Sequence, residues 1–262
     1  MLVLRPGALG DTLLAVPALR ALRRAAFPLT LAAHGAAARL LASLGEVDRG
    51  MAFDDPSVGW LFTLDRAPEE PIVAWMNADS APALKHALLV APSQPTGTDV
   101  HCGKYLLDTL RALGIETGVD ERPLELAPIA SDEVLIHPGS GSVAKNWPAA
   151  QFAEVIRAGT SPVRLIVGEA DDFSAREVEV VFGHSLPRLE HAPLAELAAR
   201  LAGCRAYLGN DSGVSHLAGL CGAKSIVLFG PTPPSVWRPL GPDVHVASFD
   251  TPPERIASLL RF

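Results

Sequence analysis

The chain has 262 residues, of which 48% are hydrophobic and 19% are charged, a composition that excludes a disordered chain and is typical of a globular protein. It carries a net charge of −7 from 29 acidic and 22 basic residues, only four of them lysine, so we expect no nucleic-acid partner. The length allows one large domain or two domains of roughly 120 residues that each bury a core.

The N-terminal half alternates short apolar strands with helical stretches. A strand over residues 2–5 precedes a helical stretch that ends at Arg24, and a strand over 29–33 precedes a second helix over 36–44. Weaker patterns then predict strands and a helix, in this order, at residues 49–53, 72–75, 87–90 and 104–113. This alternation predicts a parallel α/β domain over residues 1–125.

The segment after the first strand combines two glycines, Gly7 and Gly10, with Asp11. The glycines allow a tight turn, and Asp11 stands where the next helix begins. Asp11 is therefore the N-cap of that helix, or a carboxylate at the edge of the sheet that can accept a proton, or both. Pro17 predicts that the helix stops after one turn and restarts near the proline.

Three arginines, Arg20, Arg23 and Arg24, follow on the restarted helix. We interpret them as a solvated helix end, where the helix dipole favours positive charge. The alternative is a contact with an anionic membrane surface.

Two prolines within residues 123–128 end a charged stretch and predict a linker. After it the alternation becomes regular, with strands predicted over residues 134–137, 163–167, 206–209 and 225–229 and helices over 148–157, 173–181, 194–202 and 212–221. This pattern predicts a doubly wound domain over residues 130–262, whose last helix could pack back on the N-terminal domain. Two such domains in tandem would face each other across a cleft, with the carboxyl ends of both sheets lining it.

The loop that starts at His137 is rich in hydrogen-bond donors. It contains Ser140, Ser142 and Lys145 between a strand and a helix that opens at Pro148. It matches neither the P-loop nor the dinucleotide-binding pattern. Although a surface lysine is usually only solvated, a lysine in such a loop favours contact with an anion such as a diphosphate.

A second polar turn, residues 209–213, also lies between a strand and a helix. Asp211 is a natural N-cap, and the backbone N–H groups that start with Ser212 and Gly213 can bind phosphate. Helical spacing places His216 on the face opposite the apolar one, so we expect it to be exposed on the side of the helix start and to contact the donor diphosphate or sugar there. An exposed histidine without function is the alternative.

Acidic residues follow the strand over residues 163–167. Glu169 and Asp171 occupy the place where a carboxylate commonly holds ribose hydroxyls, although an acidic helix start explains them equally well. The acidic pairs in the sequence are adjacent and not spaced as a metal–diphosphate site requires, so we expect no metal site. The last good strand ends at the turn Phe229-Gly230-Pro231-Thr232, which we expect at the cleft edge.

The three cysteines are far apart and lack a CxxC spacing, which indicates neither a disulfide framework nor a zinc site and favours a reducing cytosol. The N-terminus lacks the regions of a signal peptide, and no stretch reaches the roughly 18 apolar residues of a membrane span. We therefore expect a cytoplasmic protein.

Four segments together resemble, in order, the motifs of glycosyltransferase family 9, whose best-known members are the ADP-heptose:lipopolysaccharide heptosyltransferases. They are Gly10-Asp11 with Pro17, Lys145-Asn146-Trp147-Pro148, Gly209-Asn210-Asp211-Ser212-Gly213 with His216, and Phe229-Gly230-Pro231-Thr232.

The resemblance implies a GT-B fold, with two Rossmann-like doubly wound domains facing across a cleft. It implies inverting, metal-independent transfer of a sugar, a heptose from ADP-heptose, to a lipopolysaccharide-core or other glycan or glycolipid acceptor. The donor is a substrate, so no cofactor is expected, and a cytoplasmic site peripheral to the inner membrane is implied. By the same resemblance Asp11 is the catalytic base, Lys145 and the Ser212-Gly213 turn contact the diphosphate, and Asp211 orients the donor sugar.

Two other functions fit the same residues. A nucleotide-sugar epimerase or hydrolase of this architecture would use the carboxylates and His216 for proton transfer at the sugar. A non-catalytic nucleotide-binding protein would need only the donor half. A measurement of turnover distinguishes the two enzymatic functions, sugar transfer and epimerisation or hydrolysis, from non-catalytic nucleotide binding.

Overall fold

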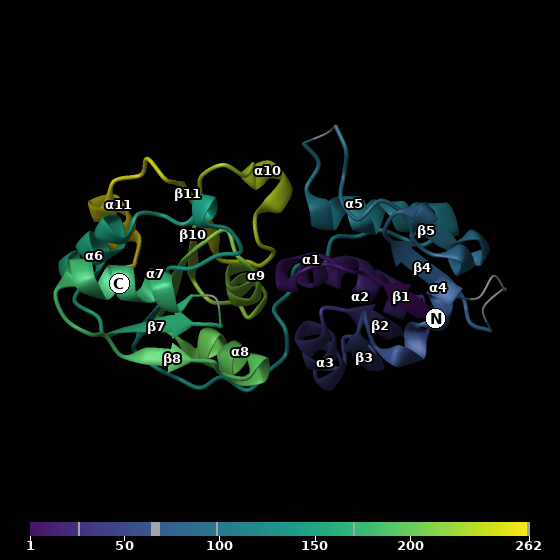
Figure 1. Cartoon of the computed structure of the whole chain (residues 1–262), viewed down its shortest axis with the longest axis horizontal. Coiled ribbons are helices and arrows are strands. Elements are labelled where there is room, and N and C mark those ends of the chain that lie inside the picture. The colour runs from purple at the N-terminus through teal and green to yellow at the C-terminus, as the bar shows by residue number, and fades with distance from the viewer. Residues whose placement is uncertain (26, 64–68, 98, 170, 261–262) are drawn as a thin grey trace. The chain divides into compact units, whose positions relative to one another are not determined.

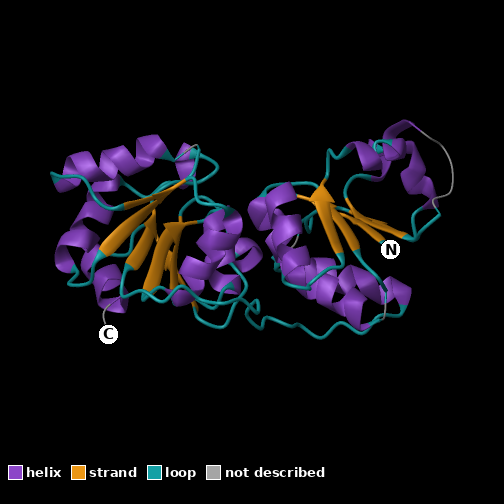
Figure 2. Ribbon diagram, turned by 90° about the horizontal axis from the view of Figure 1, so that it is seen from below, coloured by secondary structure: helices purple, strands orange, loops and turns teal. Residues whose placement is uncertain are grey.

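The computed structural model describes residues 1–25, 27–63, 69–97, 99–169 and 171–260, which fold as two compact units. Unit 1 comprises Met1–Glu121 and unit 2 comprises Arg122–Phe262. In each unit a parallel sheet is covered by helices on both faces, as the strands and helices of Figure 2 show. Each unit is therefore a doubly wound α/β structure of the predicted class.

The sheet of unit 1 has five parallel strands in the order β3-β2-β1-β4-β5. The central strands are fully buried apolar runs, which explains why they lie between two helical layers. Their bounds are β1 Leu2–Leu4, β2 Thr30–Ala33, β3 Arg49–Ala52, β4 Ile72–Trp75 and β5 Leu89–Ala91.

The helices of unit 1 begin with α1 (Leu9–Leu14) and α2 (Val16–Arg24), separated at Ala15. Pro17 is the second residue of α2, which confirms the predicted restart. The other helices are α3 Gly35–Ser43, α4 Trp60–Thr63 and α5 Cys102–Thr109, with 3-10 segments η1 Pro56–Val58, η2 Ala78–Ser80, η3 Pro82–His86 and η4 Leu110–Leu113.

The sequence analysis placed Arg20 at a solvated helix end, and for this residue the prediction is wrong. Its side chain is buried, and its Nε and Nη2 donate to the two carboxylate oxygens of Glu46 at 2.9 and 2.6 Å. Its Nη1 also donates to the Asp120 carboxylate at 3.2 Å. Partners 26 and 100 residues away give this arginine a buried ion pair, whereas Arg23 and Arg24 are exposed as expected.

The sheet of unit 2 has six parallel strands in the order β11-β10-β9-β6-β7-β8. The strand order reverses between β6 and β9, and the loops after these two strands therefore open at the same point of the carboxyl edge. The bounds are β6 Val134–His137, β7 Val163–Val167, β8 Arg188–Glu190, β9 Ala206–Asn210, β10 Ser225–Phe229 and β11 Val244–Ser248.

The helices of unit 2 cover both faces of this sheet (Figure 1). Their bounds are α6 Ala149–Ala158, α7 Asp172–Phe182, α8 Leu194–Gly203, α9 Gly213–Leu220, α10 Pro234–Trp237 and α11 Pro253–Leu260, and the 3-10 segment η5 spans Val143–Lys145. The apolar face of α11, formed by Ile256, Ala257 and Leu260, joins the core of unit 2 beside α6. The expectation that the last helix packs back on the N-terminal domain stays a prediction.

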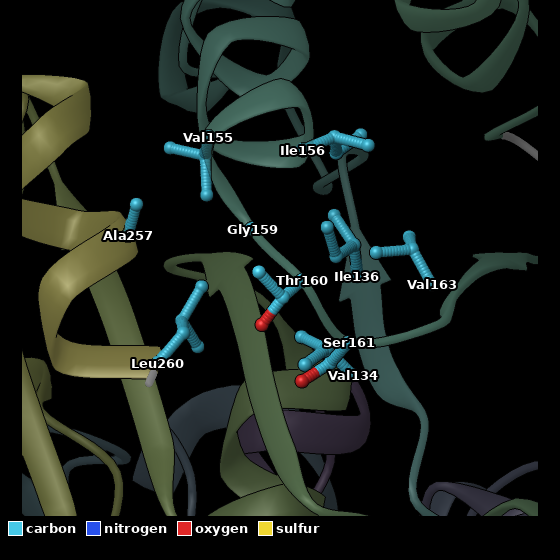
Figure 3. A pocket seen from close by; sticks show the side chains of 10 residues that line it. All are labelled: Val134, Ile136, Val155, Ile156, Gly159, Thr160, Ser161, Val163, Ala257 and Leu260. Carbon is cyan, nitrogen blue, oxygen red and sulfur yellow. The ribbon is translucent and has the colours of Figure 1, made fainter. Parts of the chain in front are cut away.

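A small apolar hollow lies between α6, α11 and the starts of β6 and β7 (Figure 3). Its volume is about 20 Å³. It is far too small for a nucleotide, and it lies at the amino ends of the strands, whereas open parallel sheets bind ligands at the carboxyl ends. Within the part of the chain that the structure describes, no helix is long and apolar enough to cross a membrane.

Candidate active site

Asp11 is the third residue of α1, at the carboxyl end of β1. Its Oδ2 accepts a hydrogen bond from the backbone N–H of Ala8 at 2.8 Å, and its Oδ1 accepts one from Nη2 of Arg5 at 3.3 Å. The N-cap position belongs to Ala8, so the prediction that Asp11 is the N-cap is wrong, although its carboxylate satisfies the N–H at that position. About a third of the side chain, 32%, is exposed.

Two neighbours fix the Asp11 carboxylate in this position. The side chain of Arg5 is only 1% exposed, so a buried positive charge lies beside the Asp11 carboxylate. Gly7 has φ +137°, and a Cβ there would lie 2.7 Å from Asp11 Oδ2, so only glycine fits. The result is a carboxylate at the edge of the sheet, with one oxygen held by a backbone donor and the other by a side-chain donor.

In unit 2, Lys145 and Asp211 form an ion pair across the carboxyl edge of the sheet. Lys145 Nζ donates to Asp211 Oδ2 at 2.7 Å, and Thr232 Oγ1 donates to the same oxygen at 2.7 Å. Lys145 is 32% exposed, while the Asp211 side chain is only 6% exposed. The loops after β6, β9 and β10 thus meet at one carboxylate, which brings three of the four segments highlighted in the sequence together.

His137 connects two further positions of the same edge. Its buried ring lies between Ser212, with Nδ1 3.1 Å from Oγ, and Asp171, with Nε2 3.0 Å from Oδ2. Burial raises the pKa of Asp171, but hydrogen bonding and charge from His137 and the Gly168 N–H outweigh it, so the pKa lies below its ordinary value of 3.8. Asp171 is therefore ionised at neutral pH and joins the loops after β6, β7 and β9.

This position changes the interpretation of Asp171. One oxygen is engaged by His137 and the Gly168 N–H, and a Cβ on Gly139 would lie 1.9 Å from the other. The carboxylate thus fills the space that Gly139 leaves, and it supports the loop. Glu169, the other predicted nucleoside contact, is exposed at the end of β7.

Asn210, the last residue of β9, fixes the path of the loop after β6. Its side chain is fully buried, with Nδ2 donating to Pro138 O at 2.8 Å and Oδ1 accepting from Trp147 N at 3.0 Å. Within the loop, Ser140 Oγ donates to Asn146 Oδ1 at 2.6 Å. Ser142 is exposed, and its backbone N–H donates to Ser140 Oγ at 3.3 Å.

The helix α9 differs from its prediction in two respects. Ser212, not Asp211, is the N-cap, because its Oγ accepts from Ser215 N at 3.4 Å while the Asp211 carboxylate turns toward Lys145. His216 is 5% exposed, so the expectation of an exposed histidine is wrong. The supposedly exposed face is covered, since a Cβ on Gly219 would lie 2.3 Å from Leu240 O.

The predicted donor-binding residues of unit 2 therefore gather at one edge, around Lys145, Asp211 and Ser212, with Gly213 half-buried beside them. His137, Asn210 and Thr232 were missed as contributors, although each lay in a segment that the sequence highlighted. A lysine cation, loop hydroxyls and the positive end of α9 form an arrangement that can bind an anion. Among the described residues, no three His, Cys, Asp or Glu side chains are grouped so that they could hold a metal ion.

Comparison with known proteins gives a consistent result. The model of "Glycosyltransferase family 9 (heptosyltransferase)" matches residues 98–256. A curated relative, lipopolysaccharide heptosyltransferase 1 of Pseudomonas aeruginosa, is 34% identical over 140 residues, which cover 50% of this chain and 38% of the relative. The matched segments span between 37% and 44% of the length of the curated relatives.

Two solved structures share the fold over nearly the whole chain. The glycosyl transferase family 9 protein of Veillonella parvula has a TM-score of 0.77 at 19% identity and covers 94% of this chain and 86% of its own. The Escherichia coli heptosyltransferase WaaC with ADP has a TM-score of 0.74 at 16% identity, with 99% and 98% covered. At these identities the similarity establishes the two-domain fold.

Proposed function

Because this chain belongs to glycosyltransferase family 9, we propose that it transfers a sugar from a nucleoside diphosphate donor to a glycan or glycolipid acceptor. The donor we propose is ADP-heptose and the acceptor a lipopolysaccharide core, since the curated relatives are named for heptosyl transfer to such molecules. Transfer proceeds with inversion and requires neither a metal nor a cofactor. The protein works in the cytoplasm at the inner surface of the membrane.

The edge of unit 2 around Lys145 supports donor binding, and this is the observation on which the proposal depends. A diphosphate brings negative charge that increases on the leaving oxygen as the bond to the sugar breaks. Lys145, the hydroxyls of Ser140 and Ser142, and the start of α9 at Ser212 and Gly213 stabilise that charge. Asp211, held by Lys145 and Thr232, orients the sugar. Glu169 contacts the nucleoside, while Asp171 supports the loop after β6 through His137.

Asp11 supplies the other requirement, a group that takes the proton of the acceptor hydroxyl. Its carboxylate lies at the carboxyl edge of unit 1, partly exposed and held by Ala8 and Arg5. As the hydroxyl oxygen attacks the anomeric carbon, its proton passes to Asp11 and the nucleoside diphosphate leaves. The attack comes from the side opposite the leaving group, which inverts the anomeric centre.

Donor binding is tested by thermal denaturation with ADP, UDP, GDP and ADP-heptose. At one common ligand concentration we expect ADP and ADP-heptose to stabilise the protein most, by roughly 2.7 kcal/mol where that concentration is 100 times their dissociation constant. Stabilisation by none of the four would contradict the proposal. Binding of a nucleotide without sugar transfer to any acceptor would favour the non-catalytic nucleotide-binding protein.

Metal independence is tested by measuring turnover in excess EDTA. Charge on the diphosphate is met by Lys145 and α9, so we expect the rate to be unchanged from that in added magnesium. A magnesium or manganese titration of the EDTA-treated enzyme is the control. Loss of activity that either ion restores would refute the metal-free mechanism.

A further inference from the structure

A pocket of about 480 Å³ opens in unit 1 at the carboxyl ends of β4 and β5. It is lined by residues 76–78, which follow β4, and by residues 90–94 and Thr96, which end and follow β5. Its volume lies within the range of small-molecule sites, roughly 300–1,000 Å³. The pocket lies at the edge where open parallel sheets bind their ligands.

Packing within unit 1 connects this pocket to Asp11. Cys102, the first residue of α5, has its Sγ 3.9 Å from the backbone oxygen of the lining residue Ser93. The next residue, Gly103, packs so closely on α1 that a Cβ there would lie 2.9 Å from Leu14 O. The wall of the pocket is thus joined through the start of α5 to the helix that carries Asp11.

The charges around Cys102 agree with this placement. Burial raises the pKa of the Cys102 thiol to about 11, with Arg5 opposing the shift and the Asp11 carboxylate adding to it. Both charged groups therefore lie within electrostatic range of the thiol. A molecule in the pocket lies on the same sheet edge as the group proposed to take a proton.

The lining itself is uncharged. Of the lining residues that the structure describes, the polar ones are Asn77, Ser93, Gln94 and Thr96, and the others are apolar. Carboxylates and phosphates are normally met by arginine or lysine, and an anion removed from water without such a partner is strongly disfavoured. The first charged residue after each lining segment, Asp79 and Asp99, is acidic and would repel an anion further.

We propose that this pocket binds the acceptor end and selects a neutral, hydroxyl-bearing sugar over an acidic or phosphorylated one. Amide and hydroxyl side chains hydrogen-bond sugar hydroxyls, while Met76, Val90 and Pro92 contact the apolar face of the ring. This inference rests on the proposed glycosyl transfer and identifies the class of its acceptor.

The test is saturation-transfer NMR on the full chain with four probes: methyl glucoside, methyl galactoside, methyl glucuronide and glucose 6-phosphate. The wild type should bind the two neutral probes about tenfold or more tightly than the two anionic ones. Ala78→Trp, at an exposed lining position, should weaken binding of the neutral probes by about tenfold or more. Gln94→Lys should shift the preference toward the anions by a similar factor.

Ser258→Lys is the matched control, because it adds the same charge at an exposed position of α11 in unit 2, and it should keep the wild-type preference. The proposal is overturned if the wild type binds an anionic probe as tightly as the neutral ones, binds no neutral probe, or is unaffected by Ala78→Trp. ADP stabilisation is measured on the same samples. If it is absent, the proposed function fails; if it is present while the neutral preference is absent, only this inference fails.

Discussion

Asp11→Asn should lower turnover by roughly 10²–10⁴-fold, because the amide keeps an oxygen for hydrogen bonding but cannot accept the proton of the acceptor hydroxyl. The amide nitrogen of asparagine cannot accept a hydrogen bond, so the protein loses the one from Ala8 N or the one from Arg5. This loss should lower the free energy of unfolding by about 1–3 kcal/mol. Initial rates measured well below the melting temperature, with ADP affinity measured by calorimetry, separate these effects. ADP affinity should match that of the parent.

Asp108→Asn is the control for this experiment. It makes the same change in unit 1, at a half-exposed carboxylate on α5 that pairs with Lys104 and Arg111, and it should transfer sugar at the parent rate. If the Asp11→Asn protein is folded, binds ADP and has the parent rate, Asp11 is not the base. The Arg5–Asp11 contact would then have only a structural role.

Lys145→Ala should weaken ADP binding by roughly ten- to a hundredfold, which corresponds to the 1.5–3 kcal/mol of a charge-assisted contact. The effect has two sources. The cation that meets the diphosphate is lost, and Asp211, only 6% exposed, keeps Thr232 but loses its ion-pair partner and then repels the phosphates. Calorimetric titration with ADP measures the change, and circular dichroism checks the fold.

Lys104→Ala provides the comparison. Lys104 is an exposed lysine in unit 1 whose partner is Asp108, so its removal should leave ADP affinity within experimental error. Equal affinities of the Lys145→Ala protein and the parent would remove Lys145 from the donor site. In that case the start of α9 and the loop hydroxyls would have to bind the diphosphate without it.

Strands made mainly of apolar residues were predicted at the bounds that the structure has, as β4, β6, β7 and β10 illustrate. Such runs are buried on both faces of a parallel sheet, so their signal is local. The edge strands β8 and β11 were missed. In β8 only Leu189 is buried, between Arg188 and Glu190, and in β11 His245 and Val246 are exposed, so neither carries an apolar run.

The site was predicted less completely, because its side chains are placed by partners distant in the sequence. The sequence analysis assigned Lys145 and Asp211 to one site, but no local pattern shows that they form an ion pair 66 residues apart. The prediction for His216 assumed that small polar residues on a helix face water. In α9 this face is buried, and Ser215 is satisfied by Tyr207 and the Asn210 carbonyl. The prediction for Arg20 was wrong because its partners, Glu46 and Asp120, are also distant in the sequence.

The hydrogen bonds of His137 and Asn210 have a consequence for how fast and at what cost unit 2 takes up a ligand. They hold the loops after β6, β7 and β9 in one conformation before any ligand arrives. If the nucleotide binds here as proposed, the conformational entropy of these loops is lost when the protein folds and not when the nucleotide binds. We therefore expect association without a slow ordering step, at a rate set by the encounter between the anion and Lys145.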